Sequence, residues 1–281
     1  MMGKIVILGH TGFLGSCLYE KFSEDPRCEV RGFSSADIDL SLPEECFKLV
    51  DIIDEDTAVI MAATSLIKNK DSAFFEKDLN MLNNLARIFA SIKVRQLVYI
   101  SSIAIYGRHS DSVIIESSPS NPDDAYGSSK LLGEKILGRV CSERKIPLTI
   151  LRPGTIYGGG DNRSPFFRFF KRIKNGEDIE IYGDGSSKLF WVHKIDLCQI
   201  IKLAISSARI GDYNIVANGN GISLARLVEL IFRICGRRTE IKFISHVKDP
   251  INLRFDISKF KFYFPEVKPI KLEVALKAYL D

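Results

Sequence analysis

Residues 4–15 read KIVILGHTGFLG, and this stretch decides the fold of the 281-residue chain. The apolar residues 5–8 predict a buried β-strand that stops at Gly9. The spacing of apolar residues over 13–22 then predicts a helix. A strand, a glycine-rich turn and a helix in this order indicate a site for the phosphates of a nucleotide, because a helix N-terminus attracts anions.

The three glycines of this turn have different expected roles. Gly9 permits the tight turn, Gly12 lets the backbone approach a pyrophosphate, and Gly15 lets the helix pack closely on the sheet. A purely structural glycine-rich turn is the alternative, but the strand directly before the turn favours nucleotide binding. The candidate cofactor-binding residues of the turn are Gly9, Thr11, Gly12, Phe13, Leu14 and Gly15.

Short apolar runs alternate with amphipathic stretches through the first two thirds of the chain. Strands are expected at 28–33, 58–62, 96–101 and 147–151, and helices at 74–92 and 126–142. Strands separated by helices form βαβ units, which require a parallel sheet covered on both faces. We therefore expect an α/β fold with a Rossmann-like doubly wound parallel sheet, forming an NAD(P)-binding domain over residues 1–152. Later segments are expected to complete part of this core sheet.

The rhythm of the sequence changes after residue 151, and residues 152–162 hold four of the 20 glycines. Helices are expected at 166–174, 195–206, 224–235 and 275–280, with strands at 179–182 and 213–216. Between 33 and 58 the chain first makes a polar turn, and a helix is expected only after Pro43. We expect residues 153–281 to form a smaller α/β lobe that binds substrate.

The composition is that of an ordinary soluble globular protein. It contains 39 Lys and Arg against 35 Asp and Glu, a net charge of +4, and 46% hydrophobic residues. Such a small surplus argues against a nucleic acid or a membrane as a partner. The six cysteines are scattered without a CxxC pair or a histidine cluster, so we expect reduced thiols, no metal site and a cytoplasmic location.

Residues 126–130 read YGSSK at the start of a predicted helix. Tyr126 and Lys130 are four residues apart, so they share one face of that helix. A free tyrosine has a pKa of about 10 and is a poor base at neutral pH. A lysine ammonium beside it stabilises the phenolate and lowers this pKa, which makes the hydroxyl a usable acid or base. A surface pair is the alternative, since YxxxK is common by chance.

A hydroxyl group precedes this motif in the sequence. The strand predicted over 96–101 leads directly into Ser102, and the C-terminal edge of a parallel strand faces the crevice in which ligands bind. With this serine in place, nearly the whole chain resembles the NAD-dependent epimerase/dehydratase family, extended short-chain dehydrogenases/reductases that act on nucleotide sugars. The motifs that carry the resemblance are GHTGFLG (9–15), SSIAIYG (101–107), YGSSK (126–130), LRPGTIYG (151–158), YGDG (182–185), VHKIDL (192–197) and LRFDISK (253–259).

The resemblance implies a catalytic role for three of these residues. Ser102 would hydrogen-bond the substrate oxygen, and Tyr126 would transfer the proton. Lys130 would lower the pKa of Tyr126 and hold the nicotinamide ribose. On the helix at 74–92, Asn80 would help to shape the site behind the cofactor, with a structural hydrogen bond as the alternative.

The resemblance also implies contacts to the cofactor and to a nucleotide-diphosphate sugar as substrate. Asp39 and Leu40 would flank the adenine. Further cofactor-binding candidates are Ser34, Ala62, Ala63, Pro153 and the pair Tyr126 and Lys130. The substrate-binding candidates are Thr155, Lys188, Trp191 and Lys248. A homodimer is expected as well.

Several positions depart from the family pattern. Dehydratases of the family carry an Asp-Glu pair after the active-site Ser or Thr, whereas this chain has Ile103 and Ala104. The related fucose synthases carry a Cys at the position of Ala104 for their 3,5-epimerisation. Thr155 replaces a usual Asn. Lys188 replaces a usual Arg, which keeps the charge but loses the bidentate geometry for a phosphate.

The choice between NAD and NADP depends on the end of the second strand, where an acidic residue binds the ribose hydroxyls of NAD and repels the 2′-phosphate of NADP. The sequence there is Phe33-Ser34-Ser35, without a carboxylate, and Arg31 lies two residues earlier. Asp37 and Asp39 are further along the chain. The sequence therefore slightly favours NADP over NAD.

Three functions remain open at this point. The first, slightly favoured, is a reductase of a nucleotide-linked 4-keto-6-deoxy sugar, because the short turn after Phe33 resembles 4-ketoreductases. The second is an NAD-dependent nucleotide-sugar 4-epimerase, because the late motifs resemble epimerases generally. The third is a non-catalytic cofactor-binding regulatory subunit. The third is disfavoured because a site without turnover need not keep Ser102, Tyr126 and Lys130 together.

Overall fold

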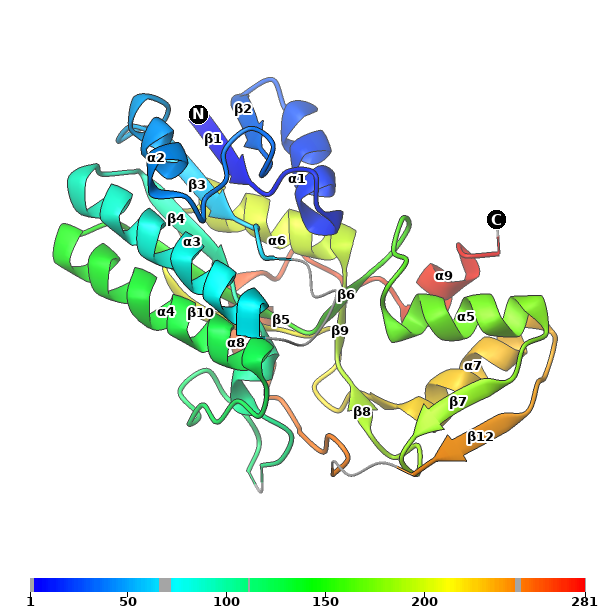
Figure 1. Cartoon of the computed structure of the whole chain (residues 1–281). Helices are drawn as coiled ribbons and strands as arrows, with labels where there is room; N and C mark the ends of the chain where they lie inside the picture. Colours follow the sequence, from blue (N-terminus) through cyan, green and yellow to red (C-terminus); the bar gives the residue numbers. More distant parts are fainter. Residues whose placement is uncertain (1–2, 66–71, 111, 246–248, 281) are drawn as a thin grey trace. The chain divides into compact units, whose positions relative to one another are not determined.

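The structure is a computed structural model that describes residues 3–65, 72–110, 112–245 and 249–280. It divides into two compact units. Unit 1 comprises residues 1–106, 119–152 and 198–213, and unit 2 comprises residues 107–118, 153–197 and 214–281. Figure 1 labels the helices and strands of both units.

Unit 1 contains the glycine-rich turn and the helices and strands of the central sheet. In chain order they are β1 (Gly3–Leu8), α1 (Phe13–Ser23), β2 (Cys28–Phe33), α2 (Pro43–Cys46), the 3₁₀ helix η1 (Phe47–Asp51), β3 (Thr57–Met61), α3 (Ser72–Ser91), β4 (Gln96–Ile100), the 3₁₀ helix η2 (Ile103–Tyr106), α4 (Ala125–Arg144), β5 (Leu148–Pro153), α6 (Lys194–Ser206) and β10 (Gly211–Ile215). Three of these elements, β5, α6 and β10, run across the boundary between the units.

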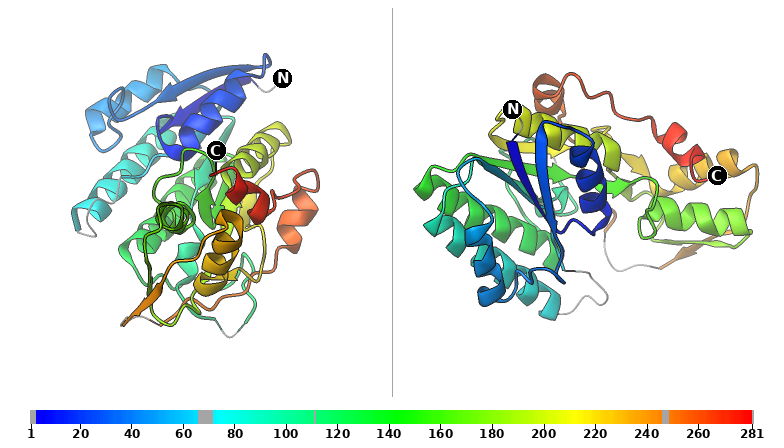
Figure 2. Two further views of the ribbon diagram at one scale, coloured as in Figure 1. Left: turned by 90° about the vertical axis from the view of Figure 1, so that its right-hand side faces the viewer. Right: turned by 90° about the horizontal axis from the view of Figure 1, so that it is seen from above.

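The described residues form a six-stranded central sheet in the order β10-β5-β4-β3-β1-β2. The pairs β1 with β2, β1 with β3, β3 with β4 and β4 with β5 are parallel. Helices cover both faces: α3 and α4 lie on one face and α1 and α6 on the other (Figures 1 and 2). The expected Rossmann-like doubly wound sheet is confirmed. The chain leaves β1 toward β2 and then crosses to β3 on the other side, so the edge above β1 and β3 is where such sheets bind ligands.

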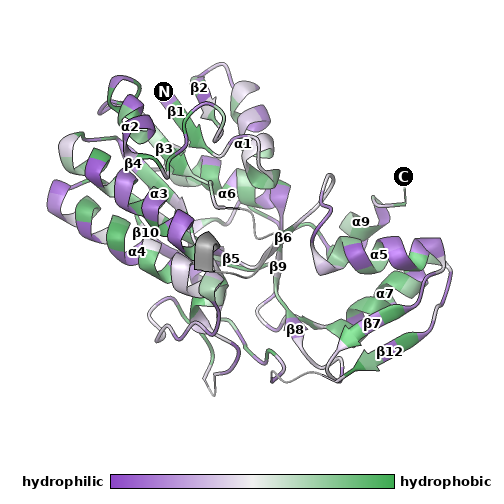
Figure 3. Cartoon of the chain, viewed as in Figure 1, coloured by the Kyte–Doolittle hydropathy of each residue, from purple (hydrophilic) through white to green (hydrophobic). Residues whose placement is uncertain are grey.

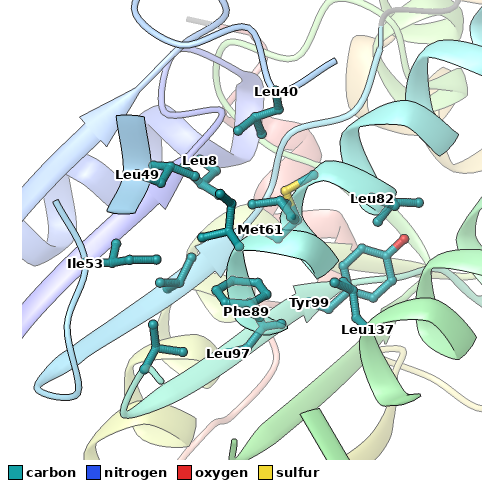
Figure 4. Close-up of a cluster of buried hydrophobic side chains, with 14 of the residues drawn as sticks. Leu8, Leu40, Leu49, Ile53, Met61, Leu82, Phe89, Leu97, Tyr99 and Leu137 are labelled. Carbon is teal, nitrogen blue, oxygen red and sulfur yellow. The ribbon is translucent and has the colours of Figure 1, made fainter. Parts of the chain in front are cut away.

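The core of unit 1 shows why these residues form this sheet. Alternate residues of β1, β3 and β4 point to one face, and each strand is apolar beyond its first residues (Figure 3). Figure 4 shows Leu8 of β1 in a cluster of buried side chains that also includes Met61 of β3 and Leu82 and Phe89 of α3. The predicted helix at 74–92 is confirmed as α3, because its buried residues recur every three or four positions.

The segment between β2 and β3 does not hold a long helix. After Pro43 the chain forms one turn of α-helix, α2, and continues directly as η1. Leu40, Cys46 and Leu49 from this segment fill the core beside the sheet. The expected helix after Pro43 is therefore present but short, because buried apolar side chains hold the segment in place of regular helical hydrogen bonding.

Unit 2 is built from short elements. They are β6 (Thr155–Tyr157), α5 (Pro165–Asn175), β7 (Ile179–Tyr182), β8 (Lys188–Leu189), β9 (Trp191–His193), β11 (Ile222–Ser223), α7 (Leu224–Cys235), β12 (Ile241–Ile244), α8 (Ser258–Tyr263) and α9 (Leu272–Lys277). α5 and α7 pack together over a second apolar cluster. Ser164 and Ser223 cap their N-termini, and Gly176 and Gly236 end them with positive φ.

Sequence reasoning missed the two- to four-residue strands β6, β8, β9, β11 and β12 and the helix α8. Such short elements carry too few residues to show a periodic pattern. Among the described residues, no helix combines the length and the apolarity needed to cross a membrane.

Candidate active site

The glycine-rich turn is held between β2 and β3 by close backbone contacts. Gly9 has a φ of +90°, and its amide donates to the carbonyl of Phe33 over 2.7 Å. A Cβ added to Gly9 would lie 2.7 Å from Cα of Ala63, and one on Gly15 would lie 2.0 Å from the carbonyl oxygen of Gly9. Side chains at these two positions would push the turn away from the strands, so glycine is required at both.

Gly12 differs from its two neighbouring glycines. It is the N-cap residue of α1 with φ −71° and ψ 169°, a conformation open to any residue, and a Cβ there would meet only the Gly9 carbonyl oxygen, at 3.2 Å. The first turn of α1 contains no acidic residue, so no negatively charged side chain there would repel an anion at the backbone amide groups. Residues 9–15 therefore fit the diphosphate of a dinucleotide, with Thr11, Phe13 and Leu14 at the same helix end.

The carboxylate of Asp37 lies at the tip of β2, where the sequence interpretation expected none. The backbone amide and the hydroxyl of Ser34 both donate to Oδ2 of Asp37, over 2.8 and 2.7 Å. These hydrogen bonds, together with the charge of His10, lower the pKa of Asp37. Because the amides of Gly9 and His10 bind the carbonyl of Phe33, the glycine-rich turn and this carboxylate are neighbours.

Asp39 and Leu40, the two residues expected to flank the adenine, lie in different environments. Asp39 accepts from Ser41 and from Nζ of Lys77, the latter over 3.1 Å, and stays partly exposed. The side chain of Leu40 is 4% exposed and belongs to the sheet core. Only Asp39 of the pair therefore presents polar side-chain atoms at the surface.

Two elements bring Ser102 and Tyr126 together. Ser102 follows β4 and is buried, and its Oγ accepts from the amide of Ala104 over 3.1 Å. Asp124 caps α4 by accepting from the amide of Gly127 over 2.7 Å, which fixes Tyr126 in the first turn. A side-chain hydrogen bond then joins Ser102 to Tyr126.

Burial sets the proton affinity of Tyr126. It raises the pKa of this phenol, and the charges of Asp78 and Asp124 raise it further, while the Ser102 hydrogen bond lowers it. The net shift is upward, which is the opposite of the direction expected from Lys130 in the sequence. The physical reason is that desolvation of the phenolate, helped by the two carboxylates, outweighs the hydrogen bond with Ser102. Tyr126 thus holds its proton at neutral pH.

Lys130 lies one helical turn beyond Tyr126 and is 6% exposed. Its Nζ donates to the carbonyl of Ile100 over 3.1 Å and lies 5.8 Å from the centroid of the Tyr126 ring. Burial lowers the pKa of Lys130 to about 8, and the charge of Asp78 acts in the opposite direction. An ammonium, a phenol and a hydroxyl thus meet beyond the C-terminal end of β4, within unit 1.

Comparison with known proteins agrees with this geometry. The pattern of the family described as "NAD dependent epimerase/dehydratase family" matches residues 5–216. The chain belongs to this family. It is therefore an extended short-chain dehydrogenase/reductase, an NAD-dependent enzyme of a family whose members act on nucleotide sugars.

Relatives within the epimerase/dehydratase family span almost the whole chain. An uncharacterized UDP-glucose epimerase of Bacillus subtilis is 24% identical, over 92% of this chain and 90% of that protein. A GDP-6-deoxy-D-talose 4-dehydrogenase of Aggregatibacter actinomycetemcomitans is 27% identical, over 86% of this chain and 85% of that protein. The crystal structure of a Thermus thermophilus UDP-glucose 4-epimerase with NAD has a TM-score of 0.85 at 19% identity, covering 98% and 96% of the two chains.

The sequence interpretation noted Asp78 on α3 as part of a family motif but gave this buried carboxylate no role. Asp78 is 4% exposed, whereas Asn80, the residue expected to shape the site of this family member, is exposed. The sequence could have indicated its burial, because Asp78, Leu82 and Leu85 have the spacing of one helix face, and that face of α3 is apolar. A charged residue on such a face is rare unless it has partners.

A buried ion pair supports the strand ends beneath the site. Arg152 at the end of β5 binds Glu134 of α4 through Nε and Nη2, over 2.9 and 2.7 Å. Arg152 also binds the hydroxyl of Tyr106 and the carboxylate of Asp212. Glu134 in turn accepts from Ser101, the residue before Ser102. This network fixes the end of β4 to the helix that carries Tyr126 and Lys130.

The substrate candidates fall in unit 2. Thr155 in β6 donates its amide to the carbonyl of Phe190 over 2.7 Å, and Trp191 in β9 is its strand partner. The Trp191 indole is 6% exposed, and its Nε1 finds no hydrogen-bond partner among the described residues. Lys188 in β8 lies in the same unit, and Lys248 lies outside the described residues. The buried Pro153, a candidate for the cofactor, also belongs to unit 2.

Proposed function

We propose that the chain reduces the 4-keto group of a nucleotide-diphosphate-linked 6-deoxy sugar, using NADH. The observation that carries the proposal is the cluster of the buried Ser102 and Lys130 with the half-buried Tyr126, in which the phenol keeps its proton. A carbonyl oxygen that gains charge needs a proton donor within hydrogen-bond reach. The relative from A. actinomycetemcomitans, a GDP-6-deoxy-D-talose 4-dehydrogenase by name, supports this reaction class.

Each of the three residues has one role in this reaction. The hydroxyl of Ser102 orients the keto oxygen of the sugar. Tyr126 would donate its phenolic proton to that oxygen as hydride adds to the sugar carbon and the C=O π electron pair moves onto the oxygen, and the ammonium of Lys130 would stabilise the phenolate that remains. The bound dinucleotide supplies the hydride to the sugar carbon.

A 4-epimerase is the second candidate. Its support is the UDP-glucose epimerase of B. subtilis among the relatives that span the whole chain. An epimerase must first remove a proton from the sugar hydroxyl, so its tyrosine has to act as a base. The raised pKa of Tyr126 favours the reductase, in which tyrosine starts as an acid.

One experiment separates the two candidates. The purified chain is incubated with NADH and a GDP- or dTDP-linked 4-keto-6-deoxy sugar, and NADH consumption is followed at 340 nm. A reductase consumes one NADH per sugar reduced. Interconversion of UDP-glucose and UDP-galactose without added dinucleotide, and without NADH consumption on the keto sugar, would establish the epimerase instead.

The position of Asp37 supports NAD as the cofactor, the reverse of the preference drawn from the sequence. Its carboxylate is exposed at the tip of β2 beside the glycine-rich turn. A carboxylate at this place accepts hydrogen bonds from the ribose hydroxyls of NAD and repels the 2′-phosphate of NADP. The sequence did not indicate this because Asp37 is four residues beyond the strand, and only the bonds to Ser34 bring it back.

Asp37→Asn is therefore expected to strengthen the binding of NADP by about five- to tenfold and to change that of NAD by less than about threefold. The asparagine keeps an oxygen for Ser34 but removes the negative charge. Fluorescence titration with NADPH and NADH measures both affinities. Glu29→Gln, which removes one exposed charge from the other half of β2, is the matched control and should leave the ratio of the two affinities unchanged.

We also expect no 4,6-dehydratase activity. That reaction needs acid and base groups beside the tyrosine, and the residues after Ser102 are Ile103 and Ala104, which carry no transferable proton. Incubation with NAD and dTDP-glucose or GDP-mannose should leave both sugars intact by mass spectrometry. Formation of a 4-keto product, which absorbs at alkaline pH, would contradict this expectation.

We keep three further parts of the sequence interpretation as proposals. Thr155, Lys188 and Trp191 are proposed to contact the nucleotide-sugar substrate, which the unpartnered indole nitrogen of Trp191 supports. The chain is proposed to be cytoplasmic and to form a homodimer. Size-exclusion chromatography with light scattering checks the dimer, which a mass near the monomer value of 31.6 kDa would contradict.

A further inference from the structure

We propose that Asp78 is a positioning residue of the active site, whose buried carboxylate keeps Lys130 in its charged form and fixes the catalytic helix to the end of β3. The inference rests on the proposed function, because it assigns a purpose to the charge on Lys130. Its physical content concerns only residues of unit 1, so it can be measured without turnover.

The carboxylate of Asp78 joins three elements around the site. Oδ1 accepts from the amide and the hydroxyl of Ser65, over 2.7 and 2.8 Å, in the loop after β3. Oδ2 accepts from Thr64 of the same loop over 3.1 Å and from Ser129 of α4, also over 3.1 Å. Ser129 directly precedes Lys130, so Asp78 on α3 is bonded to α4 at the turn that carries Tyr126 and Lys130.

These four donors are neutral groups, and a carboxylate that is 4% exposed has lost most of its hydration. A buried negative charge with neutral donors stabilises any cation nearby, because little water remains to screen it. Lys130 is that cation. Asp78 raises the pKa of Lys130 against the lowering by burial.

Other charged and titratable groups also face Lys130. Tyr126 precedes it on α4, and the ring of Tyr99 on β4 lies 5.5 Å from its Nζ. Glu134, one turn further along α4, is paired with Arg152. Asp124 at the start of α4 affects Tyr126. Asp78 is the group among these whose charge opposes the loss of the Lys130 proton while it also holds Ser129.

Removal of this charge has a defined sign. Without the carboxylate, Lys130 loses its proton at lower pH, and Tyr126, whose pKa Asp78 also raises, does the same. Reduction needs a protonated Tyr126 and a charged Lys130. Both changes therefore move the alkaline limit of activity toward lower pH, and neither compensates for the other.

Asp78→Asn tests the charge with little change of shape. Oδ1 still accepts from Ser65, and the new amide group donates to the hydroxyls of Thr64 and Ser129, which can rotate to accept. The direct measurement is NMR titration of protein labelled with ¹³C at the ε-carbon of lysine. Loss of one signal in Lys130→Arg identifies the Lys130 resonance.

The parent Lys130 signal should titrate near pH 8, away from exposed lysines. In Asp78→Asn the midpoint should fall by about 0.5–1 pH unit, and a midpoint within about 0.2 unit of the parent would overturn the proposal. Asp25→Asn is the matched control. Asp25 is also a buried carboxylate of unit 1, paired with Arg27 and Lys202, and its loss should lower the melting temperature without moving the Lys130 midpoint.

Kinetics then connect the charge to the reaction. The alkaline limb of kcat/KM on the 4-keto sugar should shift with the NMR midpoint in Asp78→Asn. In Ser129→Ala, which keeps the charge and loses one hydrogen bond, the limb should stay in place. A shifted midpoint in a chain that reduces no keto sugar would refute the proposed reaction and leave the electrostatic role of Asp78 intact. An active chain with an unshifted midpoint would refute the role of Asp78 alone.

Discussion

A Tyr126→Phe variant is expected to reduce a 4-keto sugar nucleotide roughly 10²–10⁴-fold more slowly than the parent, with nearly unchanged affinity for NAD. Reduction of the carbonyl leaves negative charge on its oxygen, and Tyr126 is the group at the end of β4 that can donate a proton there. Ser102 can orient the oxygen but is a far weaker acid. Steady-state kinetics and a separate titration with NADH measure the two quantities.

Two further variants identify the source of the loss. Lys130→Ala should lower both turnover and cofactor affinity, because the ammonium is also expected to hold the nicotinamide ribose. Tyr99→Phe is the matched control. Its ring lies 5.5 Å from Nζ of Lys130, similar to the 5.8 Å of Tyr126, but its side chain is buried in the sheet core. It should therefore retain activity. If Tyr126→Phe keeps more than about a tenth of the parent rate, the proton comes from elsewhere.

The second large effect is expected for Gly12→Val, which should abolish dinucleotide binding while the chain stays folded. A side chain at this position occupies the space that a pyrophosphate needs at the N-terminus of α1. The backbone of Gly12 already has a conformation that valine adopts, with φ −71°. The nearest protein atom to an added Cβ is 3.2 Å away. Isothermal titration calorimetry with NADH and thermal melting measure both properties.

The neighbouring glycine provides the contrast. Gly15→Ala places its Cβ 2.0 Å from the carbonyl oxygen of Gly9, so it should lower the melting temperature strongly as well as weaken binding. Gly12→Val should lower the melting temperature less than Gly15→Ala, because its Cβ lies 3.2 Å from the same oxygen. An NADH affinity of Gly12→Val within about threefold of the parent would contradict the assignment of the phosphate site.

The sequence by itself determined the parallel sheet and the places where its chemistry lies. The strands β1, β3 and β4 each contain a continuous apolar run, and the turn at 9–15 is encoded by glycines at fixed spacing. Ser102 follows a strand, and Tyr126 and Lys130 share a helix face. These features are local, because strand pattern, turn chemistry and i, i+4 spacing depend on residues close together in the chain.

Only the tertiary structure decided which carboxylates lie beside the candidate site and in which direction the pKa of Tyr126 shifts. Asp37 reaches the tip of β2 through Ser34, and Asp78 reaches α4 through Ser129, 51 positions further along the chain. The sequence pointed instead to Asn80, which the fold exposes, and to a lowered pKa for Tyr126, which burial raises. Desolvation and charge–charge interaction depend on distances in space, and residues far apart in the chain set those distances only when the sheet and its helices have packed.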